Sequence, residues 1–145
     1  MSFMVLDSMP TIALFGTGLL GEAIGRRLLE QGVTLKVWNR TTAKCQPLLE
    51  QGAALIDNLD GAAKGCQAVI TVLRDGPVSA EVIADLGDLD AICCLPMGTM
   101  GISESRQLEV QVQGKNGTYL EAPVLGSKSE ALNGSLLVMA GGDPA

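Results

Sequence analysis

The fold of this chain is decided by six consecutive residues, Gly16-Thr17-Gly18-Leu19-Leu20-Gly21. This G-x-G-x-x-G segment follows an apolar run, residues 11–15, that has the length and composition of a β-strand. It opens residues 19–31, in which apolar side chains recur at helical spacing. A strand, a glycine turn and a helix in this order are the setting in which the motif binds a dinucleotide, so we predict such a unit here.

Each glycine of the motif has its own expected task. Gly16 allows a tight turn after the strand, Gly18 lets the backbone approach a pyrophosphate, and Gly21 lets the helix lie close to the sheet. The free N–H groups of the first helical turn then face an anion. The alternative is a glycine-rich turn in an ordinary domain. The flanking strand and helix, together with a second strand at the expected distance, favour dinucleotide binding.

Composition limits the class of protein. The chain has 145 residues, which suits one domain, with 47% hydrophobic, 18% charged and only 3% aromatic residues. A core of aliphatic side chains is typical of a buried parallel sheet flanked by helices. The net charge of -6 and the absence of a basic stripe argue against a nucleic-acid partner.

Metal, membrane and targeting signals are weak. The four cysteines show no C-x-x-C spacing and the chain has no histidine, so we expect no metal site, and Cys93 and Cys94 are expected in the core. Residues 1–10 are interpreted as a leader without the features of a signal peptide. No apolar stretch approaches the roughly 20 residues that cross a bilayer, so we expect no membrane partner and a cytoplasmic location.

Strand-like and helix-like segments alternate after the leader. Strands are predicted at residues 11–15, 34–38, 53–56, 68–73, 91–95, 118–122 and 135–140. Helices are predicted at residues 19–31, 78–86 and 103–113. A short helix, broken in its interior or begun late by Pro47, is predicted at residues 42–50, and a helical turn or two at residues 59–64. Residues 103–113 alternate with the strand period, but their place between two strands favours a helix. The pattern predicts an α/β Rossmann-type doubly wound, mostly parallel sheet with helices on both faces, formed by residues 11–145.

The residues after the second strand bear on the choice of dinucleotide. NAD-selective folds place an acid about 20 residues past the glycines, where it binds the ribose 2′-hydroxyl, and this chain has Asn39, Arg40 and Thr41 there instead. These side chains offer hydrogen bonds and positive charge to a 2′-phosphate, and NADP(H) is favoured over NAD(H). The alternative is that Asn39 and Thr41 only initiate the next helix.

The carboxyl end of a later strand is also expected to border the coenzyme. In an open parallel sheet the ligand crevice lies beyond these strand ends, which places Leu73 and Arg74 against the coenzyme. Alternatively, Arg74 only pairs with the neighbouring Asp75 in solvent, at little energetic gain.

Four separated motifs together resemble the β-hydroxyacid dehydrogenase family, which includes 3-hydroxyisobutyrate dehydrogenase, tartronate semialdehyde reductase and 6-phosphogluconate dehydrogenase. They are the glycine segment, residues 37–41, the loop around Thr99, and residues 121–127 followed by 134–142. The resemblance covers nearly everything after Pro10 and implies hydride transfer between nicotinamide and a carbon bearing a hydroxyl or carbonyl group. A lysine is the general acid and base in that family.

The resemblance also implies roles for residues in this chain. Thr99 is expected near the nicotinamide, and Leu125, Gly126 and Ser127 near the substrate carboxylate. Many relatives carry Ser-Gly-Gly at that turn and Ser in place of Gly98, so no particular substrate is carried over. The catalytic lysine and the all-helical second domain of the family lie beyond Ala145. We therefore expect a fragment without a catalytic residue of its own, and an open edge on its sheet.

The expected parent protein is an NADP-dependent oxidoreductase acting on a small 3-hydroxy acid or semialdehyde, a homo-oligomer at full length. Two alternatives stay open: a non-catalytic nucleotide-binding or interaction module, and an imine reductase-like enzyme. The motif at residues 122–127 favours the hydroxyacid branch.

Overall fold

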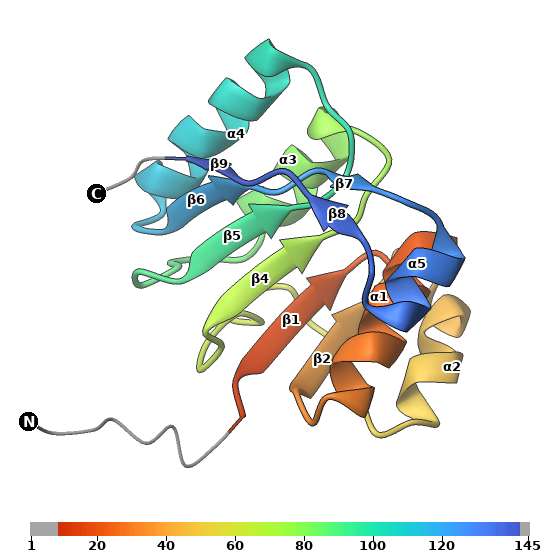
Figure 1. Cartoon of the computed structure of the whole chain (residues 1–145). Coiled ribbons are helices and arrows are strands. Elements are labelled where there is room, and N and C mark those ends of the chain that lie inside the picture. The colour runs from red at the N-terminus through yellow and green to blue at the C-terminus, as the bar shows by residue number, and fades with distance from the viewer. Residues whose placement is uncertain (1–8, 143–145) are drawn as a thin grey trace, which may run out of the picture.

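The computed structural model describes residues 9–142, and the expected leader therefore lies largely outside the described residues. Its main feature is a seven-stranded sheet in the order β3-β2-β1-β4-β5-β6-β9 (Figure 1). The strands are β1 Thr11–Phe15, β2 Thr34–Trp38, β3 Ala54–Leu55, β4 Ala68–Thr71, β5 Cys93–Pro96, β6 Thr118–Glu121 and β9 Gly141–Gly142. All pairs are parallel except that of β6 with β9.

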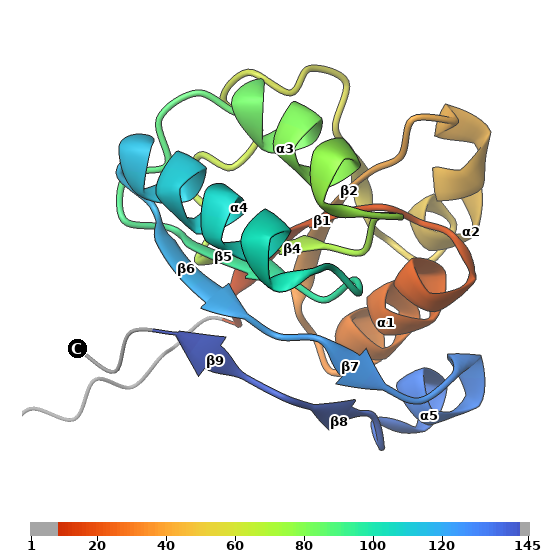
Figure 2. The same ribbon diagram turned by 90° about the horizontal axis from the view of Figure 1, so that it is seen from above.

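Helices cover both faces of this sheet. They are α1 Leu19–Glu30, the 3₁₀ helix η1 Thr42–Cys45, α2 Gln46–Leu49, α3 Gly76–Ala84, α4 Ile102–Gly114 and α5 Lys128–Asn133. Seen from above, α3 and α4 lie on one side of the strands, and α1 and α5 on the other (Figure 2). The predicted Rossmann-type doubly wound fold is confirmed.

The central strand β1 fixes the place where a ligand can bind. It pairs in parallel with β2, so that Phe15 stands opposite Trp38, and with β4, so that Phe15 stands opposite Thr71. The strand order reverses between β1 and β4, since β2 lies on one side of β1 and β4 on the other. In such a sheet the ligand crevice opens at this switch point, beyond the carboxyl ends of the strands.

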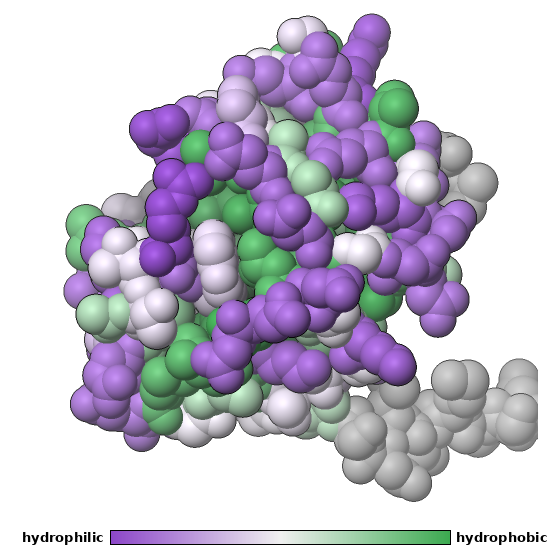
Figure 3. Space-filling model, turned by 180° about the vertical axis from the view of Figure 1, so that it is seen from behind, coloured by the Kyte–Doolittle hydropathy of each residue, from purple (hydrophilic) through white to green (hydrophobic). Residues whose placement is uncertain are grey.

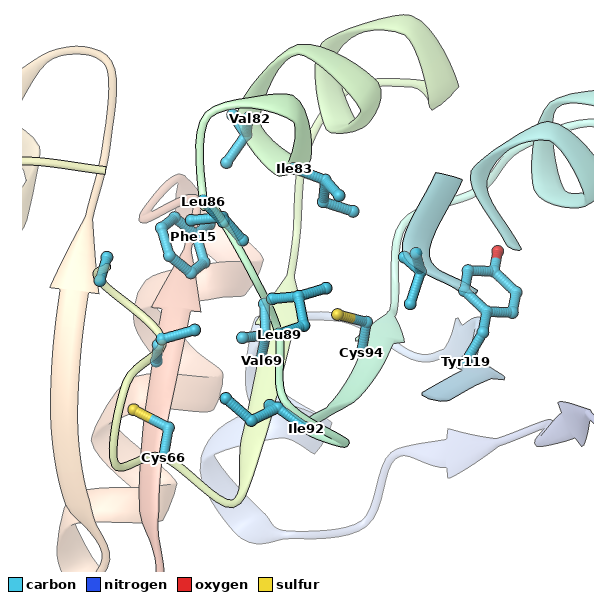
Figure 4. Close-up of a cluster of buried hydrophobic side chains, with 14 of the residues drawn as sticks. Phe15, Cys66, Val69, Val82, Ile83, Leu86, Leu89, Ile92, Cys94 and Tyr119 are labelled. Carbon is cyan, nitrogen blue, oxygen red and sulfur yellow. The ribbon is translucent and has the colours of Figure 1, made fainter. Parts of the chain in front are cut away.

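Aliphatic side chains fill both layers between sheet and helices. On the α3–α4 side, Phe15, Val69 and Leu86 belong to one buried cluster with Cys94 (Figure 4). On the α1–α2 side, a second cluster is built around Leu14, Val37 and Leu48. Burial raises the pKa of Cys94 to about 12, which fits the expected role of this cysteine as a small core residue.

The short helix expected at residues 42–50, broken or begun late by Pro47, is confirmed. A 3₁₀ turn comes first, and α2 starts only at Gln46, because Pro47 in its first turn cannot continue a helix from before it. Residues 59–64, where a helical turn or two was expected, form successive hydrogen-bonded turns and no assigned helix, and Gly61 among them adopts a φ of +73°. The helical prediction for residues 103–113 is confirmed. Apolar and polar residues alternate in this helix because the apolar Val110 lies on its exposed face, whereas Leu108 and Val112 are buried.

The last described residues depart most from the prediction. The strand expected at 135–140 shrinks to β8, Leu137–Val138, which pairs with β7, Val124–Leu125, in a separate two-stranded sheet. Helix α5 lies between them and was not predicted, although Ser127 and Glu130 form an S-x-x-E capping box, which is typical of the start of a helix. The expected open edge is partly closed, because Gly141 and Gly142 pair with the carboxyl half of β6.

Candidate dinucleotide-binding site

Two of the three motif glycines are required by the fold itself. Gly16 has φ +105°, and a Cβ there would lie 2.2 Å from the carbonyl oxygen of Val72. A Cβ on Gly21 would lie 2.0 Å from the carbonyl oxygen of Gly16, so α1 could not pack so closely on the turn. These two positions therefore explain the shape of the loop and say nothing about a ligand.

Gly18 differs from the other two glycines. Its φ is -68°, which any residue adopts, and an added Cβ would meet no protein atom within 4 Å. In front of it is a hollow of about 310 Å³ between the glycine loop and η1, lined by Thr17, Gly18, Leu19, Glu22, Ala43, Lys44 and Pro47. Neither the backbone conformation nor the packing of the protein requires glycine at this position. A ligand that lies against the backbone would require it, because a Cβ would hold the ligand away.

The first turn of α1 supplies hydrogen-bond donors at this hollow. The first bond back into the helix runs from the Glu22 amide to the Gly18 carbonyl, 2.8 Å away. The amides of Leu19, Leu20 and Gly21 precede that bond, and a helix offers such amides no carbonyl of its own. The charge of Glu22 is offset because Arg26 donates to it at 2.7 and 2.9 Å. This end of the helix can therefore accept a diphosphate.

Asn39 ties the glycine loop to the end of β2. Its Oδ1 accepts the backbone amide of Thr17 at 3.0 Å, and its Nδ2 donates to the Thr41 carbonyl at 3.1 Å. The Gly16 amide also donates to the Trp38 carbonyl at 2.8 Å. The amide group of Asn39 is thus engaged within the protein, which gives it a structural task besides the predicted contact with a 2′-phosphate.

Arg40 and Thr41 lie at the surface beside Asn39. Arg40 forms an ion pair with Glu81 of α3, with Nη2 and Oε2 3.1 Å apart. Thr41 stands at the cap position of η1, yet its side chain makes no capping hydrogen bond. The hydroxyl of Thr41 is therefore not used in the way that the capping alternative requires.

The loops after β4 and β5 meet at the same edge of the sheet. A Cβ on Gly98 would lie 2.6 Å from the carbonyl oxygen of Leu73, so the small residue allows the two loops to touch. Leu73 is half-buried and packs against the core, and Thr99 is exposed. Arg74 is 81% exposed and bonds Asp75 at 2.9 Å, as the solvent-pair alternative predicted.

The predicted substrate turn is occupied by a side chain of the protein. The backbone amide of Ser127 donates to Oε2 of Glu130 at 2.8 Å, and the Ser127 hydroxyl donates to the same oxygen. The hydrogen bonds from Ser127 lower the pKa of Glu130. Gly126 has φ +136°, which only glycine adopts without strain, and Leu125 is 56% exposed. Both donors of Ser127 are thus used in the capping box.

Two residues at this edge were missed by the sequence analysis. Lys44 lines the hollow in front of Gly18 and brings positive charge to it. Thr71, at the end of β4, is 1% exposed, and its hydroxyl has no hydrogen-bond partner among the described residues. No spacing rule identifies either residue, because each depends on how η1 and β4 are packed around the loop.

A second, larger hollow lies away from the glycine loop. It has a volume of about 460 Å³, lies at the opposite edge of the sheet, where β4 and β5 begin, and includes Asp60, Cys66 and Asp88. Figure 3 looks onto the α3–α4 side and shows polar side chains over most of it, with apolar atoms between them.

Within residues 9–142 no cluster of three metal-binding side chains occurs. No helix in the described part of the chain is both long and apolar enough to span a bilayer.

Comparison with known families identifies this architecture. Residues 11–145 match the family model of the NAD binding domain of 6-phosphogluconate dehydrogenase. The chain belongs to this family. The resemblance drawn from its four motifs is therefore confirmed, and the glycine loop, the α1 amides and the hollow are parts of an NAD(P)-binding domain.

Three known proteins contain a part that is similar to this chain. Glyoxylate/succinic semialdehyde reductase 1 of Arabidopsis thaliana is 34% identical over 139 residues, covering 92% of this chain and 48% of the reductase. Cytokine-like nuclear factor N-PAC of Drosophila melanogaster is 30% identical over 145 residues, covering 96% and 24%. Reductive aminase from Aspergillus terreus, solved with NADPH and ethyl-5-oxohexanoate, has a TM-score of 0.86 at 26% identity, covering 95% and 49%.

The chain is shorter than each of these three proteins. This chain spans about half of the reductase and of the reductive aminase, and about a quarter of N-PAC. The family is one of dehydrogenases and reductases, and this chain is its NAD-binding part.

Proposed function

We propose that this chain is the coenzyme-binding domain of an NADP-dependent oxidoreductase that acts on a small 3-hydroxy acid or semialdehyde. The observation that carries the proposal is Gly18, whose missing Cβ faces only the hollow in front of the free amides of α1. Similarity to a glyoxylate/succinic semialdehyde reductase supports the substrate class. The protein is proposed to work in the cytoplasm and to be a homo-oligomer at full length.

The two ends of the coenzyme are recognised by different residues in this proposal. The amides of Leu19 to Gly21 receive the pyrophosphate, with Lys44 as a nearby positive charge. Arg40 and the free hydroxyl of Thr41 receive the 2′-phosphate, and the absence of an acid after β2 removes the repulsion that would exclude it. Asn39 holds the loop that presents the amides.

The reacting end lies beyond β4 and β5. Bound coenzyme supplies or accepts a hydride at its nicotinamide ring. Thr99 is proposed to border that ring, and the turn of Leu125, Gly126 and Ser127 to border the substrate carboxylate. For the turn to act in this way, Ser127 has to exchange Glu130 for the substrate, since both Ser127 donors bond Glu130 in this structure. The proton is proposed to move through a lysine outside this chain.

A coenzyme titration tests the proposal directly. Trp38 is the only tryptophan of the chain and adjoins Asn39, so its fluorescence reports on this site. We expect NADPH to bind more tightly than NADH, and Arg40→Ala to weaken NADPH by roughly ten- to a hundredfold while leaving NADH nearly unchanged, since a charged hydrogen bond contributes about 1.5 to 3 kcal/mol. Arg106→Ala, which removes an exposed arginine on α4, serves as the control. Equal binding of the two coenzymes would refute the assignment.

A second function is favoured by one relative. N-PAC is described as a nuclear factor, and its match to this domain supports a non-catalytic nucleotide-binding module as the alternative. The reductive aminase keeps an imine reductase-like activity among the enzymatic alternatives. Any coding sequence after residue 145 would separate the hydroxyacid enzyme from the module: a helix with a lysine facing the nicotinamide supports the enzyme, and an unrelated sequence supports the module.

A further inference from the structure

The ion pair between Arg40 and Glu81 joins two elements on either side of the coenzyme crevice. Arg40 follows β2, whereas Glu81 lies 41 residues later on α3, which follows β4. Strands β2 and β4 flank β1 in the sheet, so the pair extends across the end of β1, beside the glycine loop. The contact therefore links the segment after β2 to helix α3, and it is not a local pair within one helix.

We infer that Glu81 is a specificity-determining residue that competes with the coenzyme 2′-phosphate for Arg40 and so weakens the preference for NADP(H). The inference rests on the proposed function of Arg40. A guanidinium that bonds a carboxylate at 3.1 Å has to share or release that partner when a phosphate arrives. NAD(H) carries only a hydroxyl at this position, so the competition acts on NADP(H) alone.

Exposure makes this exchange possible. The side chains of Arg40 and Glu81 are 71% and 68% exposed, so their mutual attraction is small and a doubly charged phosphate can replace the carboxylate. A Glu81 carboxylate that stays nearby still repels the phosphate across a few ångströms. Either way, part of the attraction between Arg40 and the 2′-phosphate is lost to Glu81.

A charge-neutral substitution tests the inference. Glu81→Gln keeps the size of the side chain and removes its charge, so we expect NADPH to bind about three- to tenfold more tightly while NADH binding stays within about twofold. The gain should shrink as the salt concentration is raised from about 0.05 M to about 0.5 M, because salt screens exposed charges. Binding is measured by Trp38 fluorescence and by calorimetry.

Two further variants make the result specific. Glu30→Gln removes the same unit of charge at the last residue of α1, where Glu30 contacts Arg27 at 3.8 Å, and is expected to change neither coenzyme. In the Arg40→Ala background, Glu81→Gln should no longer favour NADPH, since the residue it competes for is gone. The inference would be overturned if Glu81→Gln left the ratio of NADPH to NADH affinity unchanged, including the case in which both affinities fall equally.

The outcomes separate this inference from the function beneath it. If Arg40→Ala lowers NADPH affinity selectively and Glu81→Gln has no effect, only the role of Glu81 is wrong. If Arg40→Ala leaves the ratio of the two affinities unchanged, the assignment of Arg40 to the 2′-phosphate fails, and the role of Glu81 fails with it.

Discussion

The backbone amide of Thr17 donates a hydrogen bond to Oδ1 of Asn39, 22 residues further along the chain and 3.0 Å away. Thr17 is only 2% exposed, so water does not offer its amide an alternative partner. This bond joins the glycine loop to the end of β2, and it makes the shape of the proposed pyrophosphate site depend on the residue that follows this neighbouring strand.

Asn39→Ala is expected to weaken NADPH and NADH by similar factors, because the loop that holds the shared pyrophosphate loses its support. The buried amide left without a partner should also lower the free energy of unfolding by about 1 to 3 kcal/mol. Urea denaturation and fluorescence titration measure the two effects. Asn58→Ala, which removes a similar side-chain acceptor in an exposed turn, is the control. A loss confined to NADPH would show that Asn39 acts on the 2′-phosphate instead.

The three motif glycines should separate stability from binding. Gly18→Ala is expected to keep the free energy of unfolding within about 1 kcal/mol, because its Cβ meets no protein atom. It should nevertheless reduce coenzyme affinity at least tenfold. Gly21→Ala, whose Cβ would lie 2.0 Å from a backbone oxygen, should lower the free energy of unfolding by about 3 kcal/mol. Full coenzyme affinity in Gly18→Ala would contradict the proposed cradle.

Thr71→Val is expected to raise the free energy of unfolding by about 1 kcal/mol. The side chains have nearly the same shape, and valine removes a buried hydroxyl that has no partner among the described residues. Ser79→Ala provides the contrast, since the Ser79 hydroxyl is buried but bonds the Asp75 carbonyl at 3.0 Å, and its loss should destabilise. Thermal unfolding measures both. A destabilised Thr71→Val would indicate that a water molecule completes the site.

Asp75 should make stability depend on acid pH. The Val78 amide, and then Arg74, lower the pKa of this helix-capping carboxylate in the folded state. A depressed folded pKa means that the contribution is present above the unfolded value of about 3.9 and is lost as the pH falls through the folded value. The difference in stability between the wild type and Asp75→Asn should therefore be constant above about pH 5 and shrink below pH 4. Asp57→Asn, at an exposed position, is the matched control.

Local patterns predicted much of the fold and the centre of the site. The succession of apolar runs and helical segments predicted the doubly wound sheet, because β1 has the length and composition of a buried strand and α1 carries a helical period. The glycine motif located the cradle in the same way. The short elements were predicted less well, since η1 and β8 have too few residues to carry a period.

The sequence by itself determined the Rossmann architecture, the position of the glycine loop proposed to hold the pyrophosphate, and the residue types that follow β2. Only the tertiary structure decided what those side chains contact: Asn39 bonds Thr17, Arg40 bonds Glu81 and Ser127 bonds Glu130. It also decided which glycine the fold does not need, by leaving Gly18 alone of the three without a neighbouring atom. The physical reason is that backbone conformation follows local periodicity, whereas contacts across the crevice follow from the packing of β1 between β2 and β4.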